Sequence, residues 1–174
     1  MTTYETPGNA QDAYNLLLSD LVPSRLKQLG FIHSRSRFLI PCDGCWVFMG
    51  FQKSKWSTKM RVQFTINLQV ANKDVWTLAR SLSQSPSTGS PRLPSHPSPG
   101  VHYAMQNVDG VVEPTVNMRI GHLLPGSWRD YWWLVEDTTD LEQLAEDVLR
   151  TIDRFAVPWL RHEMAKQGCS GQCG

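Results

Sequence analysis

Residues 61–70 carry the pattern that most constrains the fold of this 174-residue chain. Apolar and polar residues alternate strictly through this segment, which is the period of a half-buried β-strand. The apolar positions are Val62, Phe64, Ile66, Leu68 and Val70, and the polar positions are Arg61, Gln63, Thr65, Asn67 and Gln69. A strand of this kind must bury one face against other elements. The segment therefore predicts a sheet with one face in a hydrophobic core and one polar face turned outward.

Other segments supply further strands. Residues 31–40 and 45–53 predict an antiparallel hairpin, because Asp43-Gly44 between them is a favoured two-residue turn. The second of these segments is apolar on both sides, which predicts a central position in the sheet. Residues 115–124 and 131–135 predict two more strands. Together these segments give a sheet of about five strands.

The N-terminal helical signal begins at Asn9, a favourable N-cap residue, and apolar residues keep helical spacing up to Gly30. Pro23 should kink or restart this helix, because proline lacks the N–H that the helical ladder needs. A short helix is expected at residues 73–82, with Asn72 as its N-cap.

The C-terminal helical signal opens with Thr139 and Glu142 in capping-box spacing and runs to Phe155. Pro158 can start a final helix. The order of elements favours an α+β fold: a single domain, residues 1–174, with a mainly antiparallel sheet of about five strands packed against helices from the N-terminal and C-terminal segments. A chain of this size buries roughly 70% of its unfolded surface without needing disulfides or metals.

Two segments are expected to lie outside this framework. Residues 85–100 are rich in proline and serine, a composition that supplies neither a core nor a hydrogen-bond ladder. We expect a mobile loop inserted in the domain. Residues 168–174, rich in glycine, serine and glutamine, predict a flexible tail.

Charge is unevenly distributed although the net charge is only +1. Residues 25–61 hold eight basic residues and one acid, and residues 136–153 hold seven acids and one base. Such asymmetry either marks an anionic partner or reflects two surfaces that face solvent or each other. The sequence pI of about 7.7 argues against a nucleic-acid partner.

The sequence predicts no membrane partner, because no apolar run approaches the roughly 20 residues of a membrane helix. Residues 1–11 lack the basic start and apolar core of a signal peptide. We therefore expect a cytoplasmic protein.

The four cysteines leave three alternatives open. Cys42 and Cys45 form a CxxC, and Cys169 and Cys173 form a CxxxC, which together have the composition of a four-thiolate zinc site. A disulfide is the second alternative. The third is that Cys42 and Cys45 merely flank the Asp43-Gly44 turn as free thiols. The sequence favours free thiols and no metal, with Cys42 and Cys45 as the weak metal candidates.

Polar residues at strand ends form the candidate ligand-binding site. If residues 61–70 and 115–124 are neighbouring strands, Asn67 and Arg119 share one polar surface. Arginine offers a planar fork to a carboxylate or phosphate, and lysine offers a point charge. Aromatic rings can add a flat apolar wall. The expected site comprises Lys53, Ser54, Lys55, Trp56, Asn67, Arg119, Asp130 and Trp132. The alternative is an ordinary polar sheet face with Arg119 and Asp130 paired to stabilise a turn.

Catalytic motifs are absent from the sequence: no GxSxG, HExxH, P-loop or suitably placed GxGxxG occurs. Asp130 and His122 are the weak candidates for a general base. No cofactor is expected.

A family resemblance emerges from the order of several short motifs. They are Leu26, Leu29-Gly30-Phe31, Phe51-Gln52-Lys53-Ser54, Phe64-Thr65-Ile66-Asn67-Leu68, Arg119-Ile120-Gly121, Asp130, Trp133 and Pro158-Trp159-Leu160. In this order the motifs resemble the bacterial family called domain of unknown function 4304. The resemblance covers roughly Pro23 to Leu160, apart from the proline-rich loop. The resemblance implies that these polar positions recur as a set in the family. It implies no activity, cofactor or partner. All four cysteines lie outside the family pattern.

The sequence thus predicts a non-catalytic binding module that recognises an anionic small molecule or an acidic protein surface. The alternative is an uncharacterised hydrolase or transferase that uses Asp130 or His122 as base, with Arg119 stabilising negative charge. A third possibility is self-association through an edge strand.

Overall fold

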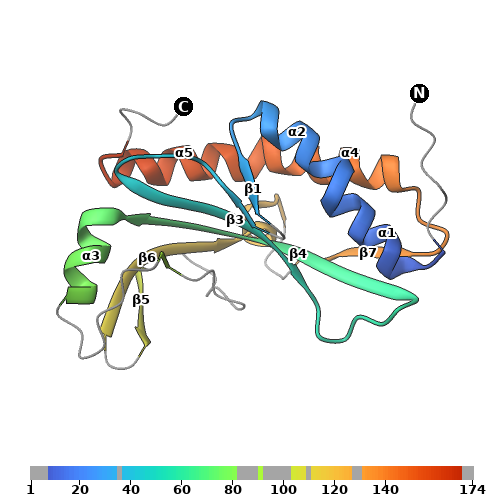
Figure 1. The fold of residues 1–174 in the computed structure, drawn as a ribbon, viewed down its shortest axis with the longest axis horizontal. Coiled ribbons are helices and arrows are strands. Elements are labelled where there is room, and N and C mark those ends of the chain that lie inside the picture. Colours follow the sequence, from blue (N-terminus) through green and yellow to red (C-terminus); the bar gives the residue numbers. More distant parts are fainter. Residues whose placement is uncertain are drawn as a thin grey trace.

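The computed structural model describes residues 8–34, 37–81, 90–91, 103–108, 111–126 and 131–169. Helices lie at the start and end of the described chain, and one more, α3, follows the longest strand (Figure 1). The helical elements are α1 (Ala10–Leu16), η1 (Leu17–Leu21), α2 (Val22–Gln28), α3 (Lys73–Ser81), η2 (Ile120–Leu123), α4 (Leu141–Thr151), η3 (Ile152–Ala156) and α5 (Val157–Lys166).

The strands form one sheet with the order β1-β2-β3-β4-β6-β5, and β7 also pairs with β4. Every pairing is antiparallel. The strands are β1 (Ile32–Ser34), β2 (Arg37–Leu39), β3 (Cys45–Lys53), β4 (Arg61–Asn72), β5 (Tyr103–Val108), β6 (Val111–Arg119) and β7 (Trp133–Glu136). The α+β class and the mainly antiparallel sheet are confirmed. The described strands number seven rather than about five, because residues 31–40 form two strands and β5 was not anticipated.

β4 organises the sheet. Along one edge it pairs with β3 over most of its length. Along its other edge it changes partner: residues 61–64 pair with β7, and residues 67–70 pair with β6. The sheet therefore has a junction beside β4, between the end of β6 and the start of β7.

The apolar face of the sheet carries the core. Phe38, Met49, Phe64, Ile66 and Leu68 are completely buried on it. α1, α2, α4 and α5 lie on this side of the sheet (Figure 1), and α1 and α5 contact β4 directly. The strict alternation of residues 61–70 thus has the expected consequence on this face.

The N-terminal helix begins as expected, because the Asn9 side chain accepts hydrogen bonds from the backbone N–H groups of Gln11 and Asp12. Its turns widen into the π-helix η1 just before Pro23, which lies in the first turn of α2. This position accommodates the missing N–H of proline.

The start of α4 differs from the predicted capping box. Asp140, not Thr139, is the N-cap, and its carboxylate accepts from the backbone N–H of Gln143. The Thr139 hydroxyl instead accepts from the N–H of Glu136 and closes the turn after β7. Both residues suit an N-cap chemically, so the sequence pattern misplaced it by one position.

The expected loop at residues 85–100 lies outside the described residues except for residues 90–91. Of the expected tail, residues 168–169 are described, and Cys169 is buried. Within the described part of the chain, the helices are too short or too polar to cross a bilayer.

Candidate functional site

The second face of the sheet is polar and yet buried. Among the described residues, eight polar or charged side chains are buried, and six of them lie on this one face of β4 and β6. These six, called here the polar face, are Thr65, Asn67, Gln69, Thr115, Asn117 and Arg119. Buried polar groups cost free energy unless they are hydrogen-bonded. Such a concentration of them on a single face is therefore the most unusual feature of the interior.

Arg119 lies at the end of β6, directly opposite Asn67 on β4. Its Nε donates to Asn67 Oδ1 at 3.2 Å, and its Nη2 donates to Gln52 Oε1 at 3.1 Å. Asn67 Nδ2 also donates to Gln52 Oε1, at 2.7 Å. The three side chains come from β3, β4 and β6 and form a closed network that fixes the plane of the guanidinium.

Trp132 completes this arrangement from the other side of the junction. The Cζ atom of Arg119 lies 5.4 Å from the centre of its ring, within the range of a cation–π contact. The sequence also predicted Asn67, Arg119 and Trp132 as site residues, and the structure brings these three together. The structure adds Gln52 to this group. Gln52 pairs with Thr65, so the alternation of side chains along a strand places it on the polar face.

Thr65 Oγ1 and Asn117 Oδ1 lie buried on the polar face and have no hydrogen-bond partner within the described part of the chain. The amide nitrogen of Asn117 is satisfied, because it donates to Thr115 Oγ1 at 2.9 Å. The site thus combines an oriented cation with oxygen atoms able to accept a hydrogen bond.

The predicted exposure of this face was wrong. Asn67 and Arg119 are each 3% exposed rather than turned toward solvent. Alternation identifies two faces of a strand but cannot tell whether the second face is covered. Here Trp132 stacks on Arg119, and α3 folds back against β4 and β6.

Lys53, Ser54, Lys55 and Trp56 lie apart from this network. Lys53 pairs with Phe64, so its side chain belongs to the helical side of the sheet, where Nζ donates to Gln11 Oε1 at 2.7 Å. Strand parity alone separates Lys53 from Asn67. Lys53 and Asn67 are both polar residues of neighbouring strands, but the alternation of side chains places them on opposite faces of the sheet.

Residues 54–60 form the tip of the β3–β4 hairpin, called here the hairpin tip. Ser54 Oγ accepts from the backbone N–H of Trp56, which fixes the turn. The Trp56 side chain is 78% exposed, and the Lys55 ammonium lies 5.1 Å from its ring. Met60 is also exposed. The hairpin tip is therefore a separate surface with apolar and basic character.

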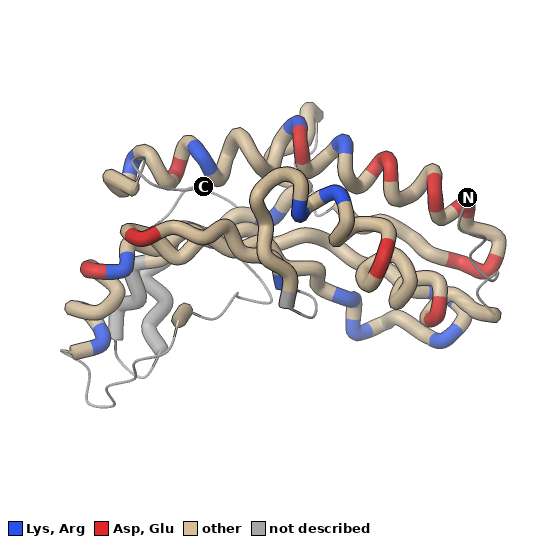
Figure 2. The backbone as a smooth tube through the Cα atoms, turned by 45° about the horizontal axis from the view of Figure 1, so that its top comes forward, with Lys and Arg blue, Asp and Glu red and all other residues tan. Residues whose placement is uncertain are grey.

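The hairpin tip, which is basic, and α4, which is rich in acidic residues, lie at the same end of the molecule (Figure 2). At the base of the hairpin, Arg61 forms an ion pair with Glu136 at 3.7 Å. This exposed contact joins the last base of residues 25–61 to the first acid of residues 136–153.

Of the two weak candidates for a general base, Asp130 lies outside the described residues. His122 lies in the short helix η2, immediately after β6, and is half-buried.

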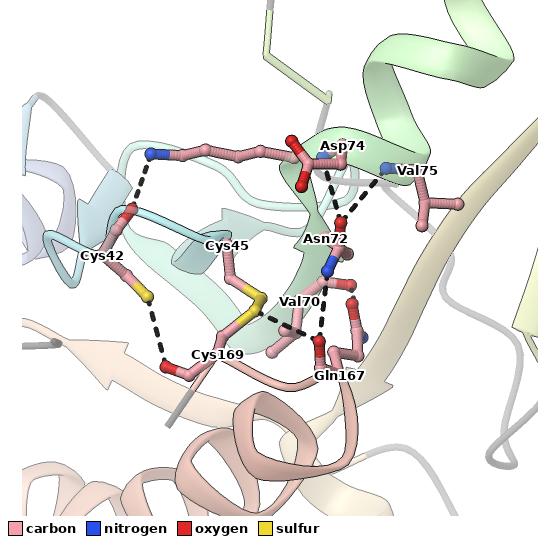
Figure 3. The surroundings of a disulfide bond; sticks show 9 residues. Cys42, Cys45, Val70, Asn72, Asp74, Val75, Gln167 and Cys169 are labelled. Carbon is pink, nitrogen blue, oxygen red and sulfur yellow. Dashed lines mark hydrogen bonds between the residues drawn. A yellow bond between two sulfur atoms is a disulfide. The ribbon is translucent and has the colours of Figure 1, made fainter. Parts of the chain in front are cut away.

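The prediction of free thiols was wrong. Cys45 at the start of β3 forms a disulfide with Cys169, which follows α5, and their Cα atoms are 5.9 Å apart (Figure 3). Cys42 is also disulfide-bonded. The reason is tertiary: α5 packs against β3, and the turn at Gly168, which has a positive φ, brings Cys169 to Cys45. In this state, no group of three or more His, Cys, Asp or Glu side chains in the described chain is arranged to hold a metal ion.

Comparison with known proteins gives one result. No curated protein and no solved structure has significant similarity to the chain. A family model, described as a domain of unknown function, matches residues 22–162, which include the whole sheet and the polar face but not α1 and η1. The chain therefore belongs to the family called domain of unknown function 4304.

Proposed function

We propose that this protein is a non-catalytic binding module that holds a small anionic molecule on its polar face through Arg119. The observation that carries the proposal is the concentration of buried polarity: six of the eight buried polar side chains in the described chain lie on this face. An unsatisfied buried polar group costs about 1–3 kcal/mol, so an interior with only a structural role is better built from apolar residues.

The geometry of Arg119 favours an anion. Two of its hydrogen-bond acceptors, Asn67 Oδ1 and Gln52 Oε1, are amide oxygens that hold the guanidinium in one plane. A guanidinium held in a fixed plane suits the two oxygens of a carboxylate or phosphate. The Trp132 ring lies beside the guanidinium and gives the site an apolar wall next to the charge.

Two buried oxygens of the polar face, Asn117 Oδ1 and Thr65 Oγ1, further restrict the class of ligand that suits the site. Asn117 Oδ1 and Thr65 Oγ1 can each accept a hydrogen bond from a ligand hydroxyl or N–H group, or from a buried water molecule. We therefore favour a hydroxylated carboxylate over a simple inorganic anion.

Titration calorimetry with malate and with inorganic phosphate tests this proposal. We expect malate to bind and Arg119→Met to weaken binding at least about tenfold, which corresponds to about 1.4 kcal/mol. Arg119→Lys should retain part of the affinity, because it keeps the charge but loses the fork. Arg61→Met, at the exposed ion pair with Glu136, is the matched control and should bind normally. Equal binding by wild type and by a folded Arg119→Met variant, or no binding of either anion, would refute the proposal.

A protein partner is the second candidate, and the observation that favours it is the 78% exposure of Trp56. Tryptophan is enriched among the residues that anchor protein interfaces. Lys55 and Lys59 give the hairpin tip a positive charge that would complement an acidic surface.

Photo-crosslinking tests this second candidate. A photoreactive residue at position 56 should capture acidic proteins in cells, and Lys55→Glu with Lys59→Glu should abolish capture. Position 75 on α3 is the control, because Val75 is exposed and apolar but outside the hairpin. Identical capture at both positions would argue against a specific surface.

A further inference from the structure

Three cysteine sulfurs from two distant parts of the chain meet at one end of the sheet. Cys45 and Cys169 are bonded across a separation of 124 residues, and Cys42 Sγ lies 3.7 Å from the carbonyl oxygen of Cys169 (Figure 3). All three side chains are buried. Their closeness comes from the fold, because α5 and β3 pack in contact.

The backbone around the three sulfurs is braced independently of the disulfide. Lys73 Nζ donates to the carbonyl oxygen of Cys42 at 2.6 Å. Asn72 Nδ2 donates to the carbonyl oxygen of Gln167 at 3.1 Å, and Asn72 Oδ1 accepts from two N–H groups at the start of α3 (Figure 3). These contacts join the turn before β3, the end of β4 and the end of α5. Breaking the disulfide would therefore not by itself separate the cysteines.

The turn between Cys42 and Cys45 also approaches Cys169 closely. A Cβ atom placed on Gly44 would lie 3.4 Å from Cys169 Sγ. Zinc prefers four thiolate or imidazole ligands in a tetrahedron, and two cysteines separated by two residues are a common half of such a site. Cys42 and Cys45 have this spacing, and Cys169 is delivered to them by the fold.

We propose that reduction of this cluster creates a structural zinc site with Cys42, Cys45 and Cys169 as ligands. In the oxidised protein all three sulfurs are disulfide-bonded, and reduction would convert them to thiols, whose thiolate forms can ligate zinc. In a thiol-reducing compartment, cysteine clusters are more often metal sites than disulfides. The zinc ion would then hold the end of α5 on β3, as the disulfide does in the oxidised protein.

The proposed conversion balances with glutathione as the reductant. Each disulfide and two glutathione thiols give two cysteine thiols and one glutathione disulfide. Each cysteine that then ligates Zn²⁺ loses one proton, because the thiolate is the ligand. Oxidation would reverse these steps and release the metal.

Metal analysis of the full chain tests the proposal. We expect about one zinc per chain when the protein is purified with glutathione and Zn²⁺, and none after oxidation by glutathione disulfide. Cys45→Ser and Cys169→Ser should each lose the zinc, and Asp43→Ala, between the two turn cysteines, should keep it. Cys173→Ser identifies whether the fourth cysteine of the sequence is also a ligand: loss of zinc makes it one, and retention leaves three cysteine ligands.

A second measurement protects against variants that fail to fold. Co²⁺ added to the reduced wild-type protein should give a sulfur-to-cobalt charge-transfer absorption, which reports thiolate ligation directly. Reduced, folded protein that binds neither Zn²⁺ nor Co²⁺ would overturn the proposal. So would a disulfide that persists in the glutathione buffer without bound metal, or zinc that survives in folded Cys45→Ser and Cys169→Ser variants.

Discussion

Asn67 and Arg119 lie directly opposite each other on β4 and β6, and Arg119 Nε donates to Asn67 Oδ1 at 3.2 Å. The pair stands where β4 exchanges β6 for β7 as its neighbour. At this junction Arg119 and the side-chain amides of Asn67 and Gln52 form directed hydrogen bonds, which apolar residues could not make. The network therefore links β3, β4 and β6 and also fixes the position of the guanidinium.

Asn67→Ala should lower the free energy of unfolding by about 1–3 kcal/mol, because Arg119 and Gln52 lose a buried hydrogen-bond partner. Urea denaturation followed by tryptophan fluorescence measures the change. Gln63→Ala is a matched control on the same strand, at a half-buried position, and should change stability by less than about 0.5 kcal/mol. Equal effects of the two substitutions would contradict the network.

Phe64→Ala should be the more damaging change, costing about 3–5 kcal/mol. Phe64 is completely buried, and its ring centre lies 5.3 Å from Tyr14 and 5.4 Å from Trp133. It thus joins α1, β4 and β7. Trp56→Ala removes an aromatic ring of greater size from the exposed hairpin tip and should have little effect on the same denaturation midpoint. A small loss for Phe64→Ala would mean that the core collapses to fill the cavity.

The sequence predicted the sheet because the period of two in residues 61–70 is a local property that survives in β4. Parity also identified Asn67 and Arg119 as occupants of one face. It did not reveal their burial, since whether a second face is covered depends on elements that pack over it from elsewhere in the chain.

The cysteines illustrate the same limit. Cys45 and Cys169 are joined only because α5 returns across the sheet, and no local pattern specifies that path. The Asp43-Gly44 turn signal was real, but it concerned the backbone and carried no information on the partner of Cys45. The prediction that Lys53 shares a site with Asn67 was wrong for a different reason. The alternation of side chains, which can be followed in the sequence, places the two residues on opposite faces of the sheet.

Asp147→Asn should lower the pKa of Tyr131. Burial raises this pKa above its usual value, and the negative charge of Asp147 raises it further because it opposes formation of the phenolate. Titration of phenolate absorbance measures the shift, with Tyr131→Phe subtracted to isolate this side chain. Asp153→Asn, an acid further along the same helical segment, is the control and should leave the titration unchanged. Asp147→Asn also replaces the charged acceptor of the Trp133 indole N–H, which lies 2.9 Å away, so the free energy of unfolding should fall modestly.

Tyr14 should make the fold sensitive to alkaline pH. Burial on α1 raises the pKa of its hydroxyl above the ordinary value of 10.0. Above that pH the unfolded chain ionises at Tyr14 and binds fewer protons than the folded chain, so the free energy of unfolding falls as pH rises. Below it, both states hold the proton and the residue contributes no pH dependence. Tyr14→Phe should therefore leave stability nearly unchanged at neutral pH and reduce the loss measured by urea denaturation above pH 10. An identical alkaline loss in the variant would assign that sensitivity to other groups.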